Sequence, residues 1–204
     1  MERKSGADLK RMIMDTTRKL LVKDGYGNLS MRKIAREINY SATSIYLHFK
    51  NKDALCHALI DEGMAMLLSQ QNKIARANKG DVFQRLRALC EGYISFGLKY
   101  SEYYEIMFLI HPDFENRFPK ASYRRARRNL DLFKMTLDEG IKNGQIDSLD
   151  TYATTNAVWA SLHGAVSILL ARRLDFRIDQ NHFINNVLDQ IVRSVAYKPT
   201  TSVL

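Results

Sequence analysis

The stretch that decides the fold is residues 29–55, LSMRKIAREINYSATSIYLHFKNKDAL. Ser30 and Ser41 each stand one residue before a helical pattern, where a side-chain oxygen accepts a hydrogen bond from an unpaired backbone N–H. Apolar residues flank both serines at the spacing of a hydrophobic staple. Two capped helices joined by a short turn form a helix-turn-helix. The stretch therefore predicts this motif in the N-terminal part of the chain.

The second helix of the pair and the residues after it carry side chains that suit a nucleic acid. Ser44, Tyr46 and His48 offer hydrogen-bonding groups, and Lys50 and Lys52 come next as partners for phosphates. Because the second helix of such a motif enters the major groove, we expect this segment to read double-stranded DNA.

The composition favours an all-α fold with a basic N-terminal module. The 204 residues are 46% hydrophobic and include only 10 Gly and 3 Pro, too few for a turn-rich β fold. Residues 1–55 hold 12 Lys and Arg against 6 Asp and Glu, whereas the remaining residues hold 19 against 16. A basic excess confined to one end indicates a polyanionic partner there. A solvated helix face explains the charge equally well. The capped helix pair favours the polyanionic partner over this alternative.

Helical periodicity continues through the rest of the chain. A helix over residues 9–23 braces the pair, and one over 52–77 connects it to the C-terminal helices. Further helices are expected over 81–100, 117–142, 151–171 and 182–196, with a turn at His111–Pro112.

The last two helices differ in pattern. Residues 151–171 are small or apolar on nearly all sides, so this helix must be covered all round, and residues 182–196 carry one apolar stripe. The pair is typical of a self-associating four-helix bundle, and we expect a homodimer through it. Ala160, Gly164 and Ala165 would allow close backbone approach there.

The C-terminal region holds a surplus of aromatic residues. Ordinary core packing explains any one of them, but buried tyrosine hydroxyls need partners, and a cavity with converging polar tips is how a ligand pocket is built. Trp159 and His163 lie one turn apart on one helix face and could address one ligand, although a lone His on an apolar helix is more often a core residue. The expected pocket residues are Tyr93, Phe96, Tyr100, Tyr104, Phe108, Phe133, Trp159 and His163.

Several functional classes are not indicated. Phosphate-binding glycine loops, nucleophile elbows and metal-spaced His or Cys sets do not occur in the sequence, so we expect no enzyme, no cofactor and no metal. Cys56 and Cys90 are expected to be reduced thiols, with a redox-sensing pair as the alternative. The N-terminus lacks an apolar leader and no run of apolar residues is long enough to span a membrane, which predicts a cytoplasmic protein.

Four segments together resemble the tetracycline-repressor (TetR) family of bacterial regulators. They are Ile34-Ala35-Arg36-Glu37, Ser41, Tyr46-Leu47-His48-Phe49 and Lys52-Asp53-Ala54-Leu55. The resemblance is specific over about residues 9–57. Further on, residues 159–164 resemble the Trp-His-Gly signature of one C-terminal subgroup of the family.

The resemblance implies about nine helices, three of them for DNA, and a helical ligand-binding and dimer-forming remainder. Asn39 stands where members of the family usually have Gly, and Asn tolerates the left-handed conformation that the turn needs. Ala42 forms no side-chain hydrogen bond, although its methyl group could meet a thymine methyl. The DNA-binding residues carried over by position are Arg32, Ala42, Thr43, Ser44, Tyr46, His48 and Lys52, the last three mostly for phosphates.

We therefore expect a DNA-binding domain over residues 1–54 and a ligand-binding, dimer-forming domain over 55–204. The expected function is a homodimeric transcriptional regulator, most simply a repressor, that binds a pseudo-palindromic operator. A small apolar or aromatic inducer would release it. The alternative is a helical carrier or adaptor that keeps the helix-turn-helix as a scaffold.

Overall fold

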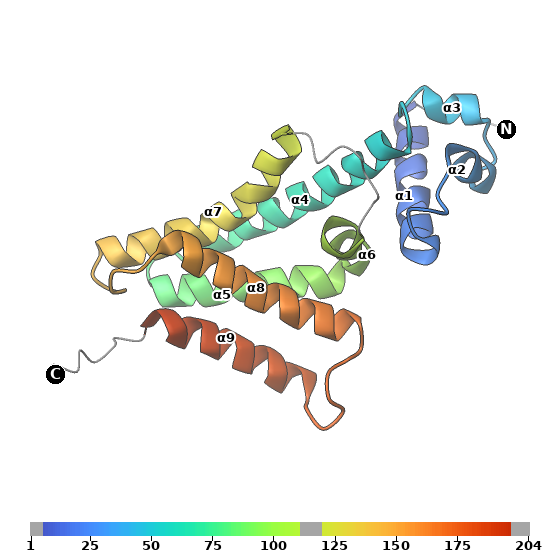
Figure 1. Ribbon diagram of the computed structural model, residues 1–204. Coiled ribbons are helices and arrows are strands. Elements are labelled where there is room, and N and C mark those ends of the chain that lie inside the picture. The colour runs from blue at the N-terminus through green and yellow to red at the C-terminus, as the bar shows by residue number, and fades with distance from the viewer. Residues whose placement is uncertain (1–5, 111–119, 197–204) are drawn as a thin grey trace. The chain divides into compact units, whose positions relative to one another are not determined.

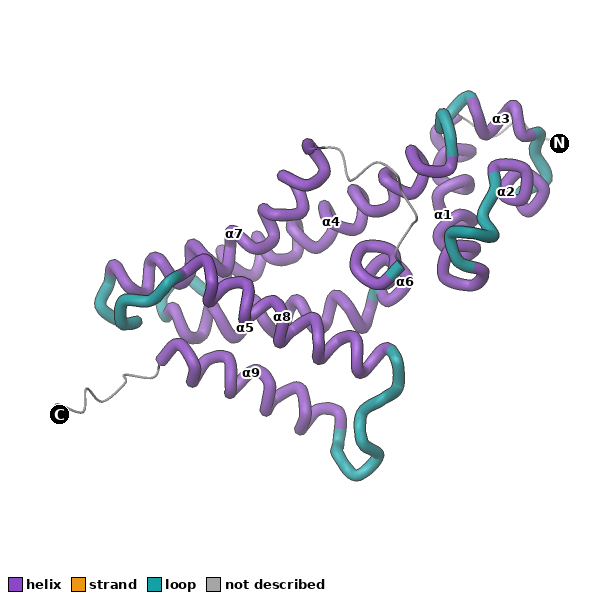
Figure 2. Tube along the Cα trace, viewed as in Figure 1, coloured by secondary structure: helices purple, strands orange, loops and turns teal. Residues whose placement is uncertain are grey.

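The computed structural model describes residues 6–110 and 120–196, in which every regular element is helical (Figures 1 and 2). Nine α-helices and one π-helical segment confirm the expected all-α class for these residues. The helices are α1 (Gly6–Asp24), α2 (Met31–Glu37), α3 (Ala42–Tyr46), α4 (Lys52–Ala77), α5 (Val82–Lys99), α6 (Ser101–Tyr104), the π-helical η1 (Glu105–Leu109), α7 (Lys120–Lys142), α8 (Thr151–Leu170) and α9 (Gln180–Ala196).

The chain folds into two compact units. Unit 1 comprises Met1–Ala65 with Tyr100–Arg125, and unit 2 comprises Met66–Lys99 with Ala126–Leu204. This division differs from a boundary after residue 54, because α6 and η1 pack against α1 and because α4 contributes residues to both units. The functional division at residue 54 stays a prediction.

In unit 1 the first three helices enclose a small core. Ile13 and Leu21 of α1, Ile34 of α2, Ile45 of α3 and Phe49 after α3 are all buried. Because one buried stripe per helix suffices to join three short helices, the opposite faces of α2 and α3 stay exposed.

Local side-chain caps begin these helices as the sequence predicts. Ser30 Oγ accepts a hydrogen bond from Lys33 N at 3.2 Å, and Ser41 Oγ accepts one from Ser44 N at 3.1 Å. Asn39, in the turn between α2 and α3, has a φ of 58°. The expectation that Asn takes the left-handed position of this turn is confirmed.

In unit 2, α5, α8 and α9 pack against one another, and α8 and α9 form an antiparallel hairpin (Figure 1). The C-terminal end of α7 packs closely on the start of α5. A Cβ atom at Gly140 would lie 2.9 Å from a methyl group of Val82 and 2.6 Å from one of Ile146. Asp150 begins α8 by accepting hydrogen bonds from the N–H groups of Tyr152 and Ala153.

The elements α6 and η1 were not expected from the sequence, in which one helix ended near residue 100. They are too short for a periodic pattern, and tertiary packing stabilises them: Tyr103, Ile106 and Met107 are buried. Gly63 of α4 permits this packing, because a Cβ atom there would overlap Met107 Sδ. The turn expected at His111–Pro112 and residues 117–119 of the expected helix lie outside the described residues.

Candidate nucleic-acid interface and ligand-binding residues

The face of α3 turned away from the unit 1 core is exposed. Thr43 and Leu47 lie one turn apart on it, with Leu47 at 81% exposure and Tyr46 at 54%. Ala42 and Ser44 are half-buried. The Ser44 hydroxyl is 2.8 Å from Ser41 Oγ, so the cap already uses part of its hydrogen-bonding capacity.

Cations occur on the segments before and after α3. Arg32 of α2 and Lys50 after α3 are exposed. Lys52, at the first position of α4, is half-buried, and its ammonium lies 4.0 Å from the centre of the Tyr26 ring. Lys52 Nζ also lies 3.5 Å from the Tyr26 carbonyl oxygen. Its charge is therefore positioned by Tyr26 rather than by a carboxylate.

Two arginines of α1 are paired with acids inside unit 1. Arg18 donates to Glu102 of α6 at 2.7 Å and to Asp15 at 2.9 Å, and Arg11 donates to Asp15 at 2.6 Å and to Glu62 of α4. The hydrogen bond from Arg11 lowers the pKa of the Asp15 carboxyl below its ordinary value. Arg11 and Arg18 therefore tie α1 to α4 and α6, and their charge is neutralised by these carboxylates.

The eight residues predicted to bind DNA all lie in unit 1, on α2, on α3 or between α3 and the first turn of α4. Their roles stay predictions. Sequence reasoning missed Leu47 as a candidate. The signal was present: because Ile45 and Phe49 take core positions one turn apart, Leu47, midway between them, must point to the opposite side.

The eight predicted ligand residues divide between the units. Tyr93 and Phe96 of α5, Phe133 of α7 and Trp159 and His163 of α8 belong to unit 2. Three belong to unit 1, namely Tyr100, Tyr104 and Phe108. Within unit 1, the rings of Tyr104 and Phe108 pack with centroids 4.9 Å apart.

In unit 2 the structure brings Tyr93, Trp159 and His163 together. The Trp159 indole Nε1–H donates a hydrogen bond to Tyr93 Oη at 3.0 Å. The Trp159 and His163 rings stack with centroids 5.3 Å apart and planes 23° apart. Burial lowers the pKa of His163, because desolvation disfavours the imidazolium. The neutral ring is therefore the favoured form beside Trp159.

Thr155 Oγ1 on α8 and Gln71 Oε1 on α4 are buried polar atoms of unit 2 that have no hydrogen-bond partner among the residues that the structure describes. Thr155 precedes Trp159 by one helical turn, on the same face. A buried polar atom without a partner costs free energy, so such an atom needs an explanation. Sequence reasoning missed both residues, and the signal was a polar side chain within an otherwise apolar helix face.

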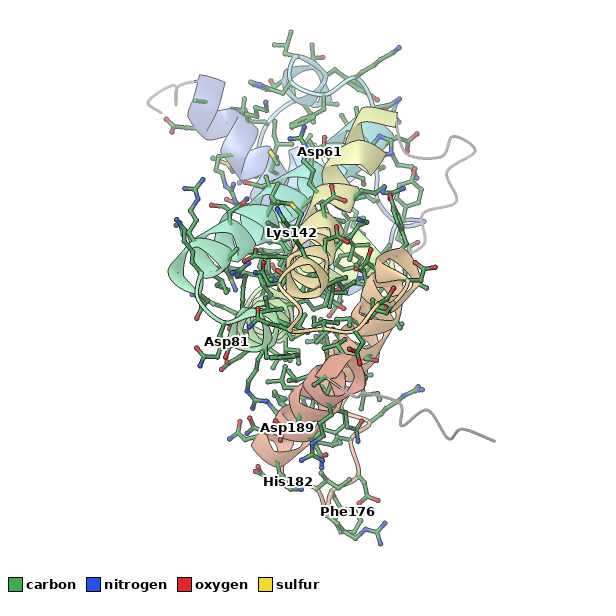
Figure 3. All side chains as sticks on the ribbon, turned by 90° about the vertical axis from the view of Figure 1, so that its left-hand side faces the viewer. Asp61, Asp81, Lys142, Phe176, His182 and Asp189 are labelled. Carbon is green, nitrogen blue, oxygen red and sulfur yellow. The ribbon has the colours of Figure 1, made fainter. Side chains whose placement is uncertain are left out.

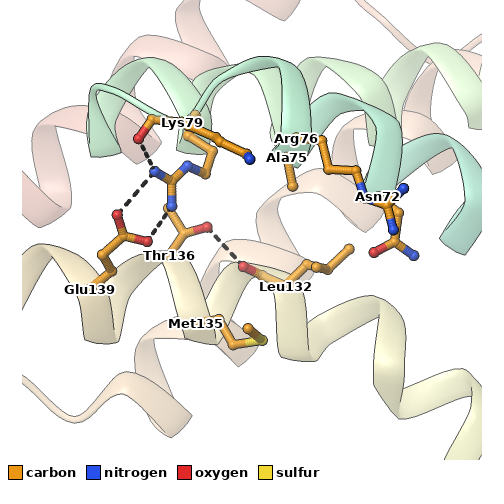
Figure 4. A pocket seen from close by; sticks show the side chains of 9 residues that line it. Asn72, Ala75, Arg76, Lys79, Leu132, Met135, Thr136 and Glu139 are labelled. Atoms are coloured by element: carbon orange, nitrogen blue, oxygen red, sulfur yellow. Dashed lines mark hydrogen bonds and ion pairs between the residues drawn. The ribbon is translucent and has the colours of Figure 1, made fainter.

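A groove of about 500 Å³ separates the second half of α4 from α7 in unit 2 (Figure 4). Arg76 and Lys79 stand on the α4 side, and Met135 and Glu139 on the α7 side. Arg85 also lines the groove and donates to the carbonyl oxygens of Asn78 and Lys79, at 2.7 and 2.6 Å, and to the Glu139 carboxylate. None of the eight predicted ligand residues lines this groove.

Three further features concern metal sites, membrane spans and the two cysteines. Among the residues that the structure describes, no group of three or more His, Cys, Asp or Glu side chains is placed to hold a metal ion. No helix in the same part of the chain is long and apolar enough to cross a membrane. Cys56 and Cys90 are free, buried thiols, and burial raises the pKa of each to about 12.

Solved structures share this fold. A protein of unknown function from Rhodococcus sp. RHA1 superposes with a TM-score of 0.80 over 96% of this chain and 98% of that one, at 23% identity. The regulator FadR of Bacillus subtilis, solved in complex with stearoyl-CoA, superposes with a TM-score of 0.74 over 92% of this chain and 99% of that one, at 19% identity.

Sequence comparisons identify the family. An uncharacterized HTH-type transcriptional regulator of Haemophilus influenzae is 37% identical over 71 residues, which span 35% of this chain and only 38% of that curated relative. A model of the bacterial regulatory proteins of the tetR family matches residues 13–59, and a model of the tetracyclin repressor-like C-terminal domain matches residues 86–191. Because the second match alone spans more than half of the chain, this protein belongs to the TetR family of transcriptional regulators and carries a helix-turn-helix DNA-binding domain.

Proposed function

We propose that the protein is a homodimeric repressor that reads a pseudo-palindromic operator through α3 and is released by a small apolar ligand. The observation that carries the proposal is the capped α2–α3 pair, whose outer face is exposed and flanked by cations. Arg32 and Thr43 would contact base edges, and Lys50 and Lys52 would contact phosphates. A regulator of this kind, neither enzyme nor membrane protein, would work in the cytoplasm, where bacterial DNA lies.

The proposed dimer forms through α8 and α9. In the isolated chain α8 exposes a stripe of small residues, Ala153, Ala157 and Ala160, and Gly164 on the same stripe faces open space. Ala165, expected from the sequence to join this stripe, is instead buried in the protomer. A helix apolar on nearly all sides needs cover on its outer face as well, and a second copy of the hairpin supplies it.

A groove of about 340 Å³ between α8 and α9 also supports a dimer through these two helices. Ala157 and Ser161 line its α8 side, and Val187 and Gln190 line its α9 side. Small side chains on α8 beside longer ones on α9 suit helices that pack two by two. Ile168, also on α8, is 39% exposed and would be covered in such a bundle.

The proposed ligand lies beside Tyr93, Trp159 and His163, where aromatic rings meet polar tips. Thr155 Oγ1, buried without a partner one turn from Trp159, would hydrogen-bond a polar group of the ligand. The stearoyl-CoA bound by the Bacillus subtilis neighbour makes a long acyl chain a reasonable first ligand to test.

Coupling between ligand and DNA is a matter of thermodynamic linkage. A ligand releases the operator only if it prefers a conformation whose two reading helices are wrongly spaced, and DNA must then weaken ligand binding by the same factor. Helix α4 runs without interruption from unit 1 into unit 2, so a displacement of α4 by the ligand is the proposed route.

Selection from a random DNA pool tests the proposal. The purified protein should enrich one pseudo-palindrome with half-sites about 34–36 Å apart, or a multiple of that distance, and its affinity should fall steeply with salt. Arg32→Ala should relax the preference at one or two base pairs. Failure to enrich any sequence at low salt would favour the carrier or adaptor instead.

The ligand is tested by the fluorescence of Trp159, the single tryptophan of the chain. Titration with stearoyl-CoA, and in parallel with free stearate and coenzyme A, should change the emission only for a molecule that binds beside the indole. The same molecule must lower operator affinity. A ligand that binds tightly and leaves operator affinity unchanged would contradict the proposed switch.

A further inference from the structure

Leu47 is the most exposed large apolar residue of the described part of unit 1, at 81% exposure. A single exposed leucine is ordinary on a protein surface. Leu47 is distinguished by its place, because it comes directly after α3 and lies one turn beyond Thr43 on the outer face. The side chain therefore extends the exposed face of the proposed reading helix.

The remaining side chains of this face offer few hydrogen bonds to base edges. Ala42 offers none, and Tyr46 is expected mostly to contact phosphates. The Ser44 hydroxyl is already bonded to Ser41 Oγ. Thr43 contributes a methyl group beside its hydroxyl, and Leu47 contributes only apolar surface. The face between Thr43 and Leu47 therefore favours an apolar contact over hydrogen-bonding readout.

Charge on the same module favours DNA as the occupant of this face. Arg32 and Arg36 are exposed on α2, and Lys50 is exposed in the segment between α3 and α4. A protein or membrane partner would also cover an apolar residue. An apolar surface on the reading helix, with exposed cations on the neighbouring segments, instead matches the major groove of DNA, which phosphates border. In that groove the apolar group on a base edge is the C5-methyl of thymine.

We propose that Leu47, together with the Thr43 methyl group, recognises thymine at one position of each half-site by covering its C5-methyl. This inference rests on the proposed operator binding through α3. It makes Leu47 a specificity-determining residue and predicts that the selected half-site contains a thymine whose identity matters through its methyl group alone.

Deoxyuridine tests the proposal, because it pairs as thymine does and lacks only the methyl group. In the selected operator each thymine is replaced in turn by deoxyuridine, and the dissociation constant is measured for the full-length protein. At one thymine per half-site the wild-type protein should lose about fourfold in affinity, as expected for uncovering one methyl group. Leu47→Ala should bind the thymine operator more weakly and should show a smaller deoxyuridine effect than the wild type, because only the Thr43 methyl group remains to cover the thymine methyl.

Matched controls separate this effect from general loss of function. Phe176→Ala removes another exposed apolar side chain, from the α8–α9 loop (Figure 3), and should keep the full deoxyuridine effect. Thermal unfolding of Leu47→Ala should match the wild type, since the side chain is exposed. If wild type ignores every deoxyuridine, or if Leu47→Ala keeps the wild-type discrimination, the proposal is wrong. Absence of any selected operator would instead overturn the proposed operator binding itself.

Discussion

Trp159 and Tyr93 are joined by a hydrogen bond of 3.0 Å, donated by the indole Nε1–H on α8 to the phenol oxygen on α5. The bond gives the Tyr93 hydroxyl a partner. Tyr93 is only 2% exposed, so leaving this hydroxyl unpaired would cost free energy. It also fixes the indole against α5, while its ring stacks on His163. A ligand that approaches Trp159 therefore meets an indole whose N–H is already used, so the free hydrogen-bonding groups nearby belong to other residues.

The first prediction concerns Tyr93→Phe. Loss of the acceptor leaves the indole N–H unpaired and should lower the free energy of unfolding by about 1 kcal/mol. It should also shift the emission of Trp159, the only tryptophan. Urea unfolding monitored by fluorescence measures both effects. Tyr152→Phe is the control, because that tyrosine is 55% exposed and its hydroxyl accepts from Arg127 rather than from the indole; an equal response of the two variants would rule out the assigned bond.

The second prediction concerns pH and His163. Burial lowers the pKa of His163 in the folded protein below the 6.5 of the free side chain. The unfolded chain therefore takes up the proton first as pH falls, and stability is lost from about pH 6.5 downwards until the folded pKa is passed. His163→Phe keeps a ring against Trp159 and removes the titration. Its melting temperature should fall less than that of wild type between pH 7.5 and 5, and parallel curves would contradict the assignment.

The third prediction concerns Lys52→Ala. If Lys52 contacts a phosphate, the variant should bind all DNA sequences more weakly and lower the slope of log K against log salt by about one unit. Lys142→Ala is the control, because Lys142 is an exposed lysine at the end of α7 (Figure 3) and should leave the slope unchanged. Changed sequence preference would point to a base contact. A loss of stability with an unchanged slope would leave Lys52 as a partner of Tyr26 only.

The fourth prediction concerns the two thiols. Because burial raises the pKa of both Cys56 and Cys90 to about 12, almost none of either thiol is ionised at pH 8. Both should react slowly with a disulfide reagent such as 5,5′-dithiobis(2-nitrobenzoate) in the native protein and rapidly in urea. Fast modification of one thiol in the native state would revive the redox-sensing alternative.

Much of unit 1 could be predicted from local rules. The caps at Ser30 and Ser41 and the left-handed Asn39 depend on side chains that act on backbone groups a few residues away, so one sequence suffices to predict them. The extents of α4 and α8 could also be predicted from the sequence, that of α8 from its long run of small and apolar residues.

Other features arise only when distant segments meet. The short α6 and η1 form because Gly63 lets Met107 approach α4, a contact between residues that no local pattern links. The cations Arg11 and Arg18, equally basic in the sequence, are neutralised by Glu62 and Glu102 from later helices. The single Trp159–Tyr93 bond likewise spans 66 positions.

The sequence by itself therefore determined the helix-turn-helix, its caps and turn, and the helical class, because these depend on interactions within a few residues. Only the tertiary structure decided which charges remain exposed and which aromatic residues share unit 2. The physical reason is that burial and ion pairing are properties of packed surfaces, and these surfaces are assembled from residues far apart in the chain.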